Sequence, residues 1–285
     1  MNYIQRAKKF NTKKRLGQNF LIDESVLDYI INAACDINDS TIIEIGPGIG
    51  FLTEKLCKNA KKVITCEVDD DAVNYLKKNL LVNNTNLKLV HNDILKTNIS
   101  DMTDEPKVKV IANIPYYITS PIIAHLLGEI DDLTNPNRNR ISEIILMVQY
   151  EVANRIVASE NSNNKEYGLL SILSQFYCDV EFLKKIKAKS FYPSPKVDSA
   201  LVRFKVRSYP RVESDDYSFL KKVIKGCFLS RRKNIKNSLI QSGFNKDNVR
   251  KTLKDLNIDE NIRGEKLSLG SMNLIAETLK TSYKL

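Results

Sequence analysis

The fold of this chain is decided by one stretch of its sequence, Thr41-Ile42-Ile43-Glu44-Ile45-Gly46-Pro47-Gly48-Ile49-Gly50-Phe51. Its first five residues form a short, mostly β-branched apolar run, which predicts a buried strand. The glycines that follow allow the backbone to approach a ligand closely and to aim the N-terminus of a helix at it. A strand, a glycine turn and a helix in this order begin a βαβ unit.

The same alternation of short apolar runs and amphipathic stretches continues along the first two hundred residues. Further strands are predicted at 63–67, 87–91, 108–112, 143–148, 178–182 and 200–204, with helices such as 51–57 and 72–81 between the first of them. This order predicts an α/β fold with a doubly wound, mostly parallel sheet of seven strands. The last two strands lie close to the proline-punctuated loop 190–199, and we expect them to form an antiparallel pair at one edge.

The pattern changes after residue 205, where only helical periodicity remains. Apolar residues recur at three- and four-residue spacing from Leu220 to Phe228, and more helices are predicted at 247–256 and 269–280. We therefore predict two domains, residues 1–207 with the sheet and residues 208–285 as a small all-helical domain.

Composition excludes several classes of protein. The 285 residues are 42% hydrophobic and 27% charged, and no apolar run approaches the roughly 20 residues that span a bilayer. The N-terminus lacks the apolar block of a secretory signal. The five cysteines are scattered without a C-x-x-C pair and there are only two histidines, so neither a disulfide framework nor a metal site is expected. A reducing, cytoplasmic location fits this cysteine usage.

The net charge of +10 is concentrated at the two ends of the chain. Residues 201–285 carry 19 Lys and Arg against 9 Asp and Glu, and residues 1–15 carry six bases and no acid. A neutral or acidic centre between two basic ends favours a polyanionic partner, and nucleic acid is the one we expect. Solvated lysine-rich surface is the alternative interpretation.

The glycine turn does not match a dinucleotide site. The pattern G-x-G-x-x-G requires a third glycine at the position of Phe51, whereas Gly50 comes one place early. A nucleoside ligand is therefore favoured over a pyrophosphate, and a dehydrogenase is disfavoured.

Two acidic residues extend this interpretation. Glu67 ends the second predicted strand, where a carboxylate can accept hydrogen bonds from both hydroxyls of a ribose. Asp93 follows the third predicted strand, where it can accept a hydrogen bond from an adenine amino group while Ile94 lies against the ring. Together with Gly46 and Gly48, these residues predict a site for S-adenosylmethionine.

The motif Asn113-Ile114-Pro115-Tyr116 follows the strand at 108–112 and suits the gripping of a planar amino group. In isolation it is also compatible with an ordinary strand-to-proline turn. At the edge that holds the cofactor residues, it predicts methylation of a base.

Four motifs in order now resemble the rRNA adenine dimethyltransferase family. They are Gly17-Gln18-Asn19-Phe20-Leu21, Glu44-Ile45-Gly46-Pro47-Gly48, Asn113-Ile114-Pro115-Tyr116 and Phe191-Tyr192-Pro193-Ser194-Pro195-Lys196-Val197-Asp198-Ser199. The resemblance extends from Arg15 to about Lys280. Two segments of the helical domain, 231–239 and 262–268, are similar to the KsgA type and favour it over the Erm type.

The resemblance implies a class I, Rossmann-like methyltransferase that dimethylates two adjacent adenosines in the 3′-terminal hairpin loop of small-subunit (16S) rRNA during subunit assembly, acting as a monomer. It carries cofactor contacts onto Asn19, Leu21, Gly46, Glu67, Asp93 and Asn113. It also suggests how the motif works: the Asn113 side-chain oxygen and the Pro115 carbonyl accept from the target amino group, and no dedicated general base is needed. Tyr116 and Phe191 are expected to stack on the two faces of the target base, while Tyr117 and Tyr192 are expected to pack.

Basic residues outside the site are the candidates for phosphate contacts, which position RNA without specifying its sequence. They are Lys13, Lys14, Arg15, Arg231, Arg232, Lys233 and Lys236. Two alternatives stay open: a large-subunit, Erm-type methyltransferase, and a non-catalytic RNA-binding assembly factor that retains the fold.

Overall fold

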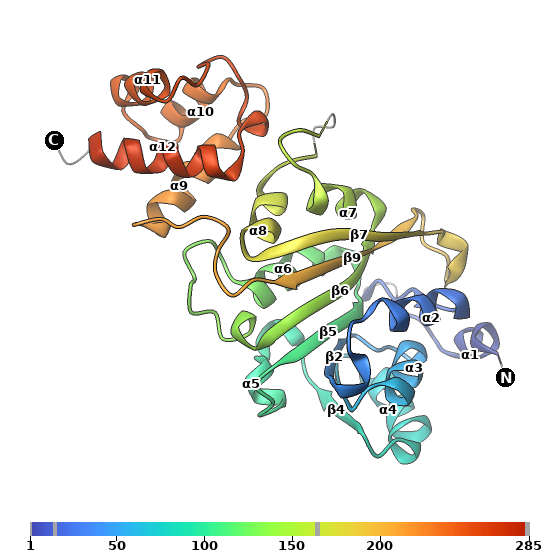
Figure 1. The fold of residues 1–285 in the computed structure, drawn as a ribbon. Coiled ribbons are helices and arrows are strands. Elements are labelled where there is room, and N and C mark those ends of the chain that lie inside the picture. The colour runs from blue at the N-terminus through green and yellow to red at the C-terminus, as the bar shows by residue number, and fades with distance from the viewer. Residues whose placement is uncertain (1, 14–15, 163–165, 283–285) are drawn as a thin grey trace. The chain divides into compact units, whose positions relative to one another are not determined.

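The computed structural model describes residues 2–13, 16–162 and 166–282. Its main sheet contains seven strands in the order β4-β3-β2-β5-β6-β9-β7 (Figure 1). Their bounds are β2 Thr41–Ile45, β3 Lys62–Glu67, β4 Leu87–His91, β5 Val108–Asn113, β6 Ile141–Gln149, β7 Cys178–Ile186 and β9 Ser199–Val206. Two short strands, β1 (Phe20–Leu21) and β8 (Phe191–Tyr192), form a separate antiparallel pair.

The strand directions confirm the predicted mostly parallel sheet. Strand β2 runs parallel to β3 and β5, β3 parallel to β4, and β5 parallel to β6. Strand β9 runs antiparallel to β6, with Leu146 opposite Val202, and β7 is the edge strand beside β9. The carboxyl ends of β2, β3, β4 and β5 therefore meet at one edge of the sheet, which is where open α/β sheets bind ligands.

Helices connect and cover the strands. They are α1 Tyr3–Lys9, α2 Glu24–Ala33, α3 Phe51–Asn59, α4 Asp70–Asn79, α5 Ile99–Met102, α6 Thr119–Leu127, α7 Tyr150–Val157, α8 Leu169–Tyr177, α9 Tyr217–Cys227, α10 Ile235–Gln241, α11 Lys246–Asp255 and α12 Leu269–Ser282. Within the described ranges, no helix has the length and apolarity needed to cross a membrane.

The core explains why the central strands read as continuous apolar runs. Ile42 and Ile43 are adjacent in β2, point to opposite faces of the sheet and are both fully buried. On the Ile42 face, one hydrophobic cluster joins apolar residues of α2, α3 and α4 to alternate residues of the strands. Figure 1 shows these three helices, in blue to cyan, gathered beside β2.

The chain divides into two compact units. The first comprises Met1–Gly128, Thr134–Ala153 and Asp179–Val206, and the second comprises Glu129–Leu133, Asn154–Cys178 and Arg207–Leu285. In the second unit α9 packs on α10 and α12, and Gly264 lies so close to the Cys227 carbonyl that a Cβ there would be 2.1 Å from its oxygen. The domain limits at residues 207 and 208 stay a prediction.

Candidate active site

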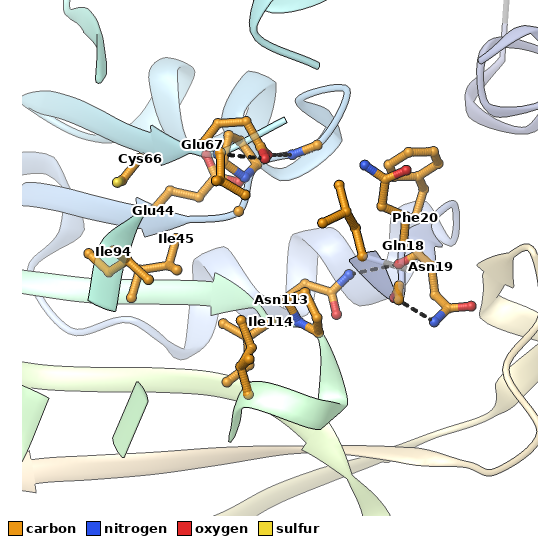
Figure 2. A pocket seen from close by; sticks show the side chains of 18 of the residues that line it. Gln18, Asn19, Phe20, Glu44, Ile45, Cys66, Glu67, Ile94, Asn113 and Ile114 are labelled. Atoms are coloured by element: carbon orange, nitrogen blue, oxygen red, sulfur yellow. Dashed lines mark hydrogen bonds between the residues drawn. The ribbon is translucent and has the colours of Figure 1, made fainter. Parts of the chain in front are cut away.

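The carboxyl edge of the sheet holds a pocket with an empty volume of about 1010 Å³, part of which is open to solvent. It is lined by residues at the ends of β2, β3 and β5, by residues after β4, and by the N-terminal segment Leu16–Leu21. Figure 2 shows Glu67 and Asn113 on separate strand ends, with Gln18, Asn19 and Phe20 completing the wall. A mostly apolar hollow with a few polar groups at this edge of an open α/β sheet suits a small-molecule ligand.

The turn after β2 is shaped by glycines in the left-handed region. Gly46 has φ +63° and Gly48 has φ +57°, a backbone conformation that residues with a Cβ rarely adopt. A Cβ built on Gly46 would meet nothing within 4 Å, whereas one on Gly48 would lie 2.7 Å from the ring of Phe20. The two positions thus combine open space for a ligand with close approach of an aromatic wall.

The carboxylate of Glu67 is fixed by backbone donors. One oxygen, Oε2, accepts from the amide of Gly48 at 3.0 Å, and Oε1 accepts from the amides of Val68 and Asp69 at 2.9 Å each. Burial raises its pKa despite these bonds. A carboxylate has about four acceptor sites, so acceptor capacity remains beyond the three backbone bonds.

Glu44 is the second-last residue of β2 and is 1% exposed. Its Oε2 accepts from the Thr53 hydroxyl at 2.6 Å. Burial, together with the nearby charge of Glu67, raises the pKa of Glu44 to about 8. Near neutral pH this side chain is therefore largely a neutral acid.

Asp93 is placed at the tip of β4, as predicted. Its Oδ1 accepts from the amide of Leu95 at 3.0 Å and so begins the short 3₁₀ turn Ile94–Lys96. No partner is assigned to Oδ2 among the described residues. Ile94 is 6% exposed and lines the pocket, so an acceptor and an apolar surface adjoin there.

Hydrogen bonds and ion pairs hold the N-terminal segment beside the pocket. Gln18 Nε2 donates to Asp69 Oδ2 at 2.7 Å, while the Lys13 ammonium pairs with both Asp69 and Asp71. Although burial alone would raise the pKa of Asp69, the bonds from Lys13 and Gln18 bring it below its usual range. Lys13 is thus already engaged in ion pairs. Its predicted partners in an RNA site, Lys14 and Arg15, lie outside the described residues.

Asn113 is oriented by the same segment. Its Nδ2 donates to the Asn19 carbonyl at 3.1 Å, and Asn19 Nδ2 donates to the Gly17 carbonyl at 3.0 Å (Figure 2). Because the amide nitrogen is committed, the oxygen Oδ1 is the atom left to accept, and it has no partner among the described residues. Leu21, also predicted to contact the cofactor, lines the pocket and is 3% exposed.

The rest of the motif after β5 forms a tight turn. The Pro115 carbonyl accepts from the amide of Ile118 at 3.2 Å and keeps a second lone pair. The hydroxyl of Tyr116 is hydrogen-bonded to the Ser199 hydroxyl at 2.6 Å, and burial raises the pKa of Tyr116. The two motifs that end at Tyr116 and Ser199 are 83 residues apart in sequence and meet here.

Phe191 is not among the residues that line this pocket. It pairs with Leu21 in the small sheet, belongs to the hydrophobic core and is 2% exposed. Its stacking on a base stays a prediction, and it requires the ring to move out of the core. Tyr117, expected to pack, is instead 61% exposed at the rim. That expectation was wrong because exposure depends on the course of the turn, which the sequence does not reveal.

The predicted phosphate contacts of the second unit lie near the start of α10. Arg231, Arg232 and Lys233 are exposed. Lys236, in contrast, pairs with Glu260 and is 14% exposed along its side chain. Within residues 2–13, 16–162 and 166–282, no group of His, Cys, Asp and Glu side chains is arranged to hold a metal ion.

Sequence reasoning missed the fastening of the N-terminal segment. Asp69, the residue before α4, binds both Lys13 and Gln18, and Phe20 forms the wall against Gly48. Both Gln18 and Phe20 belong to the first of the four motifs, which was a signal of their importance. Their partners could not be predicted, because Asp69 lies 51 residues after Gln18 and Gly48 lies in the turn after β2.

The parallel sheet, the glycine turn and the carboxylate at the next strand tip define a class I methyltransferase. The chain belongs to the ribosomal RNA adenine dimethylase family, whose sequence pattern matches residues 9–281. This confirms the resemblance drawn from the four motifs.

Individual relatives agree in fold and length. The chain is 39% identical over 272 residues to the protein named ribosomal RNA small subunit methyltransferase A of Clostridium botulinum (strain Okra / Type B1), and the match covers 95% of each chain. It is similar to a solved dimethyladenosine transferase from Plasmodium falciparum, with 26% identity and a TM-score of 0.73 over 92% of this chain and 96% of that one. It is also similar to the 23S rRNA methyltransferase ErmE, with 25% identity and a TM-score of 0.68 over 92% and 100%.

Proposed function

We propose that the protein transfers methyl groups from S-adenosylmethionine to the exocyclic amino groups of two adjacent adenosines in the 3′-terminal hairpin loop of small-subunit rRNA. Family membership and the name of the Clostridium botulinum relative support the rRNA substrate and the small subunit. The pair of adjacent adenosines, the hairpin and the residue roles are the finer part of the proposal.

The pocket residues fit the methyl donor. Open space beside Gly46 suits the close approach of a ligand to the backbone, and the side-chain oxygens of Glu67 and Asp93 offer acceptors for ribose hydroxyls and an adenine amino group. When bound, S-adenosylmethionine supplies a methyl group on a positively charged sulfur. Gly48, Ile94, Asn19 and Leu21 are the further residues proposed to hold it.

The observation that carries the proposal is the hydrogen bond from Asn113 Nδ2 to the Asn19 carbonyl. It leaves Oδ1 to accept from a ligand, and the second lone pair of the Pro115 carbonyl lies two residues further along the turn. Two acceptors on one short turn suit the two N–H bonds of an adenine amino group. The lone pair of that nitrogen is delocalised into the ring, so acceptors that draw it toward tetrahedral geometry expose the lone pair for attack.

The reaction then needs placement rather than a strong base. The nitrogen lone pair forms the new bond to the methyl carbon, the sulfur keeps the electrons of the broken bond, and the cationic nitrogen loses a proton to water. Oδ1 of Asn113 and the Pro115 carbonyl stabilise the positive charge that develops on nitrogen. The proposal therefore needs no histidine as a general base.

Tyr116 is proposed to stack on the target base. Its hydroxyl is held by Ser199, which limits rotation of the ring, and an aromatic surface offsets part of the stacking that an extruded base loses. Arg231, Arg232 and Lys233 are proposed to contact phosphates of the rRNA, because exposed cations are free to displace counterions.

A transfer assay tests the proposal. The protein is incubated with radiolabelled S-adenosylmethionine and, separately, with unmethylated small and large ribosomal subunits. We expect label on the small subunit, mapped to two adjacent adenosines near the 3′ end of its rRNA. Label on the large subunit alone would contradict the choice of subunit, and label on neither would contradict catalysis.

One structural likeness favours a second candidate. The similarity to ErmE, a 23S rRNA methyltransferase, extends over the whole of that chain, so methylation of large-subunit rRNA is the alternative. The same assay separates the two candidates.

A further inference from the structure

Tyr117 is a large aromatic residue that the structure leaves open to solvent. It is 61% exposed, yet it lines the rim of the pocket directly after the residue proposed to stack on the target base. An exposed ring gains little from packing, and its hydroxyl has no hydrogen-bond partner assigned in the described part of the chain. Its position at the rim is therefore not explained by the stability of the fold.

One side of the ring lies beside the N-terminal segment. A Cβ built on Gly17 would lie 3.4 Å from both Cδ1 and Cε1 of Tyr117 and 3.6 Å from Cβ of Pro115. Gly17 itself has φ +59°, which favours glycine at this position. A methyl group at Gly17 would therefore reach one side of the ring, and most of the side chain faces solvent.

The turn separates Tyr117 from its neighbour Tyr116. Both lie in the 3₁₀ turn Tyr116–Ile118, closed by the bond from the Ile118 amide to the Pro115 carbonyl. Side chains one residue apart in a 3₁₀ turn diverge by about a third of a circle. Accordingly Tyr116 reaches Ser199 in the interior, and Tyr117 projects at the rim.

We infer that Tyr117 is a stacking platform for the nucleotide adjacent to the target adenosine, and that it favours substrates in which that nucleotide is a purine. The inference deepens the proposed function and rests on it. When one base leaves a helical stack, its neighbour loses a partner on one side, and RNA-binding proteins restore such stacking with aromatic side chains. Two consecutive tyrosines that diverge from one turn suit two consecutive bases, one in the pocket and one at its rim.

A double-mutant cycle between protein and RNA tests this assignment. Wild-type protein, Tyr117→Ala and Tyr117→Phe are assayed on unmethylated small subunits and on reconstituted subunits in which the adjacent adenosine is replaced by uridine, a weaker stacking base. Transfer to the retained adenosine is measured as kcat and KM. Tyr209→Ala, which removes a tyrosine that is even more exposed (79%), is the control, and affinity for S-adenosylmethionine is measured by calorimetry for every variant.

We expect Tyr117→Ala to raise KM for the unmodified subunit about 10-fold with little change in kcat, and Tyr117→Phe and Tyr209→Ala to stay within about 2-fold of wild type. Replacement of the adjacent adenosine by uridine should raise KM for the wild type. For Tyr117→Ala, KM should be the same on the uridine-containing and the unmodified subunits. An unchanged KM in Tyr117→Ala, equal effects of uridine in both proteins, or a Tyr117→Phe variant as impaired as Tyr117→Ala would each overturn the inference.

The outcomes distinguish this inference from the function on which it rests. If the wild type transfers methyl groups to the small subunit and KM is the same for Tyr117→Ala, only the stacking role fails. If the wild type transfers to neither subunit, the proposed function fails and the stacking role fails with it. A loss of cofactor affinity in Tyr117→Ala that matches the change in KM would identify a structural role and overturn the inference.

Discussion

Asn113 is the residue on which the proposed chemistry depends most. Its amide nitrogen is committed to the Asn19 carbonyl and its oxygen is left without a partner among the described residues. The side chain is therefore oriented as an acceptor before any substrate arrives. Preorganised dipoles of this kind are worth the most where charge develops in the transition state.

Asn113→Ala should therefore lower kcat for methyl transfer by at least about 100-fold, while the protein still folds and binds the small subunit. Single-turnover transfer and subunit binding are the two measurements. Asn74→Ala, on the exposed face of α4, is the control and should match the wild type. Transfer by Asn113→Ala at the wild-type rate would contradict the acceptor role.

Glu44 should make the stability of the protein depend on pH. Burial first, and the charge of Glu67 second, raise its folded-state pKa from 4.5 to about 8. Between these values the folded state binds more protons than the unfolded state. The favourable contribution of the neutral acid is thus complete below pH 4.5 and is lost as pH rises toward 8.

The free energy of unfolding should accordingly fall, relative to that of Glu44→Gln, by up to about 1.4 kcal/mol for each pH unit in this window. Urea unfolding of both proteins at pH 5.5 and pH 8.0, without ligand, measures the difference. The glutamine retains an acceptor for Thr53 but does not titrate. Parallel changes in the two proteins would show that Glu44 ionises at an ordinary pKa.

At the residue scale, the sequence predicted which side chains line the pocket better than it predicted which aromatic side chains are exposed. Asn19, Gly46, Glu67, Asp93 and Asn113 all line one pocket, because parallel strands bring their carboxyl ends together whatever the details of packing. The exposure of Phe191 and Tyr117 was not predictable, since it depends on contacts made across the fold.

Among the elements, the N-terminal segment forms one wall of the pocket. Residues Leu16–Leu21 form one wall, and Asp69, the residue before α4, bonds to Gln18 in this segment and to Lys13 before it. Among the described residues, the two-residue strand β1 gives this segment ladder hydrogen bonds to its partner β8. The hydrogen bond from Gln18 to Asp69, the bond from Asn113 to the Asn19 carbonyl and the burial of Phe20 and Leu21 attach the segment further.

Removal of one link should weaken binding of the methyl donor. Lys13→Ala is expected to raise the Kd for S-adenosylmethionine about 10-fold, because the wall must then be ordered at the expense of binding free energy. Calorimetric titration measures it, with Lys9→Ala, an exposed lysine at the end of α1, as the control. Equal affinities of Lys13→Ala and wild type would mean that the segment holds its position without this link.

Strands were predicted more accurately than helices. The predicted limits of β2 and β4 agree with the structure, since each is a short apolar run followed by glycine or polar residues. Helix α2 was not predicted, although Asp23 caps it through Ser25. The pairing of β1 with β8 joins residues about 170 positions apart, and two-residue strands leave no periodicity to detect.

At the scale of the whole molecule, opposite charge decides which cations are available to RNA. The ion pairs of Lys13 and Lys236 join residues 56 and 24 positions apart, so a count of basic residues along the sequence does not reveal them. Arg231, Arg232 and Lys233 remain exposed. They are therefore the stronger candidates for phosphate contacts.

Replacement of these three residues by glutamine should weaken binding to the small subunit and flatten its salt dependence. The slope of log K against log salt concentration should shrink by roughly 0.7 to 0.9 for each phosphate that the variant no longer neutralises, with affinity for S-adenosylmethionine unchanged. The triple variant Lys61→Gln/Lys77→Gln/Lys78→Gln, at exposed positions in and before α4, removes the same charge and is the control. A slope equal to that of the wild type would contradict the assignment.

The central claim is that this pocket dimethylates two neighbouring adenosines of small-subunit rRNA. The most direct test is mass spectrometry of nuclease fragments from unmethylated small subunits after incubation with the protein and S-adenosylmethionine. We predict N6,N6-dimethyladenosine at two adjacent positions near the 3′ end with the wild type, and unmodified adenosine at both with Asn113→Ala. Dimethyladenosine formed equally by Asn113→Ala, or a fragment that stays unmodified after incubation with the wild type, would contradict the claim.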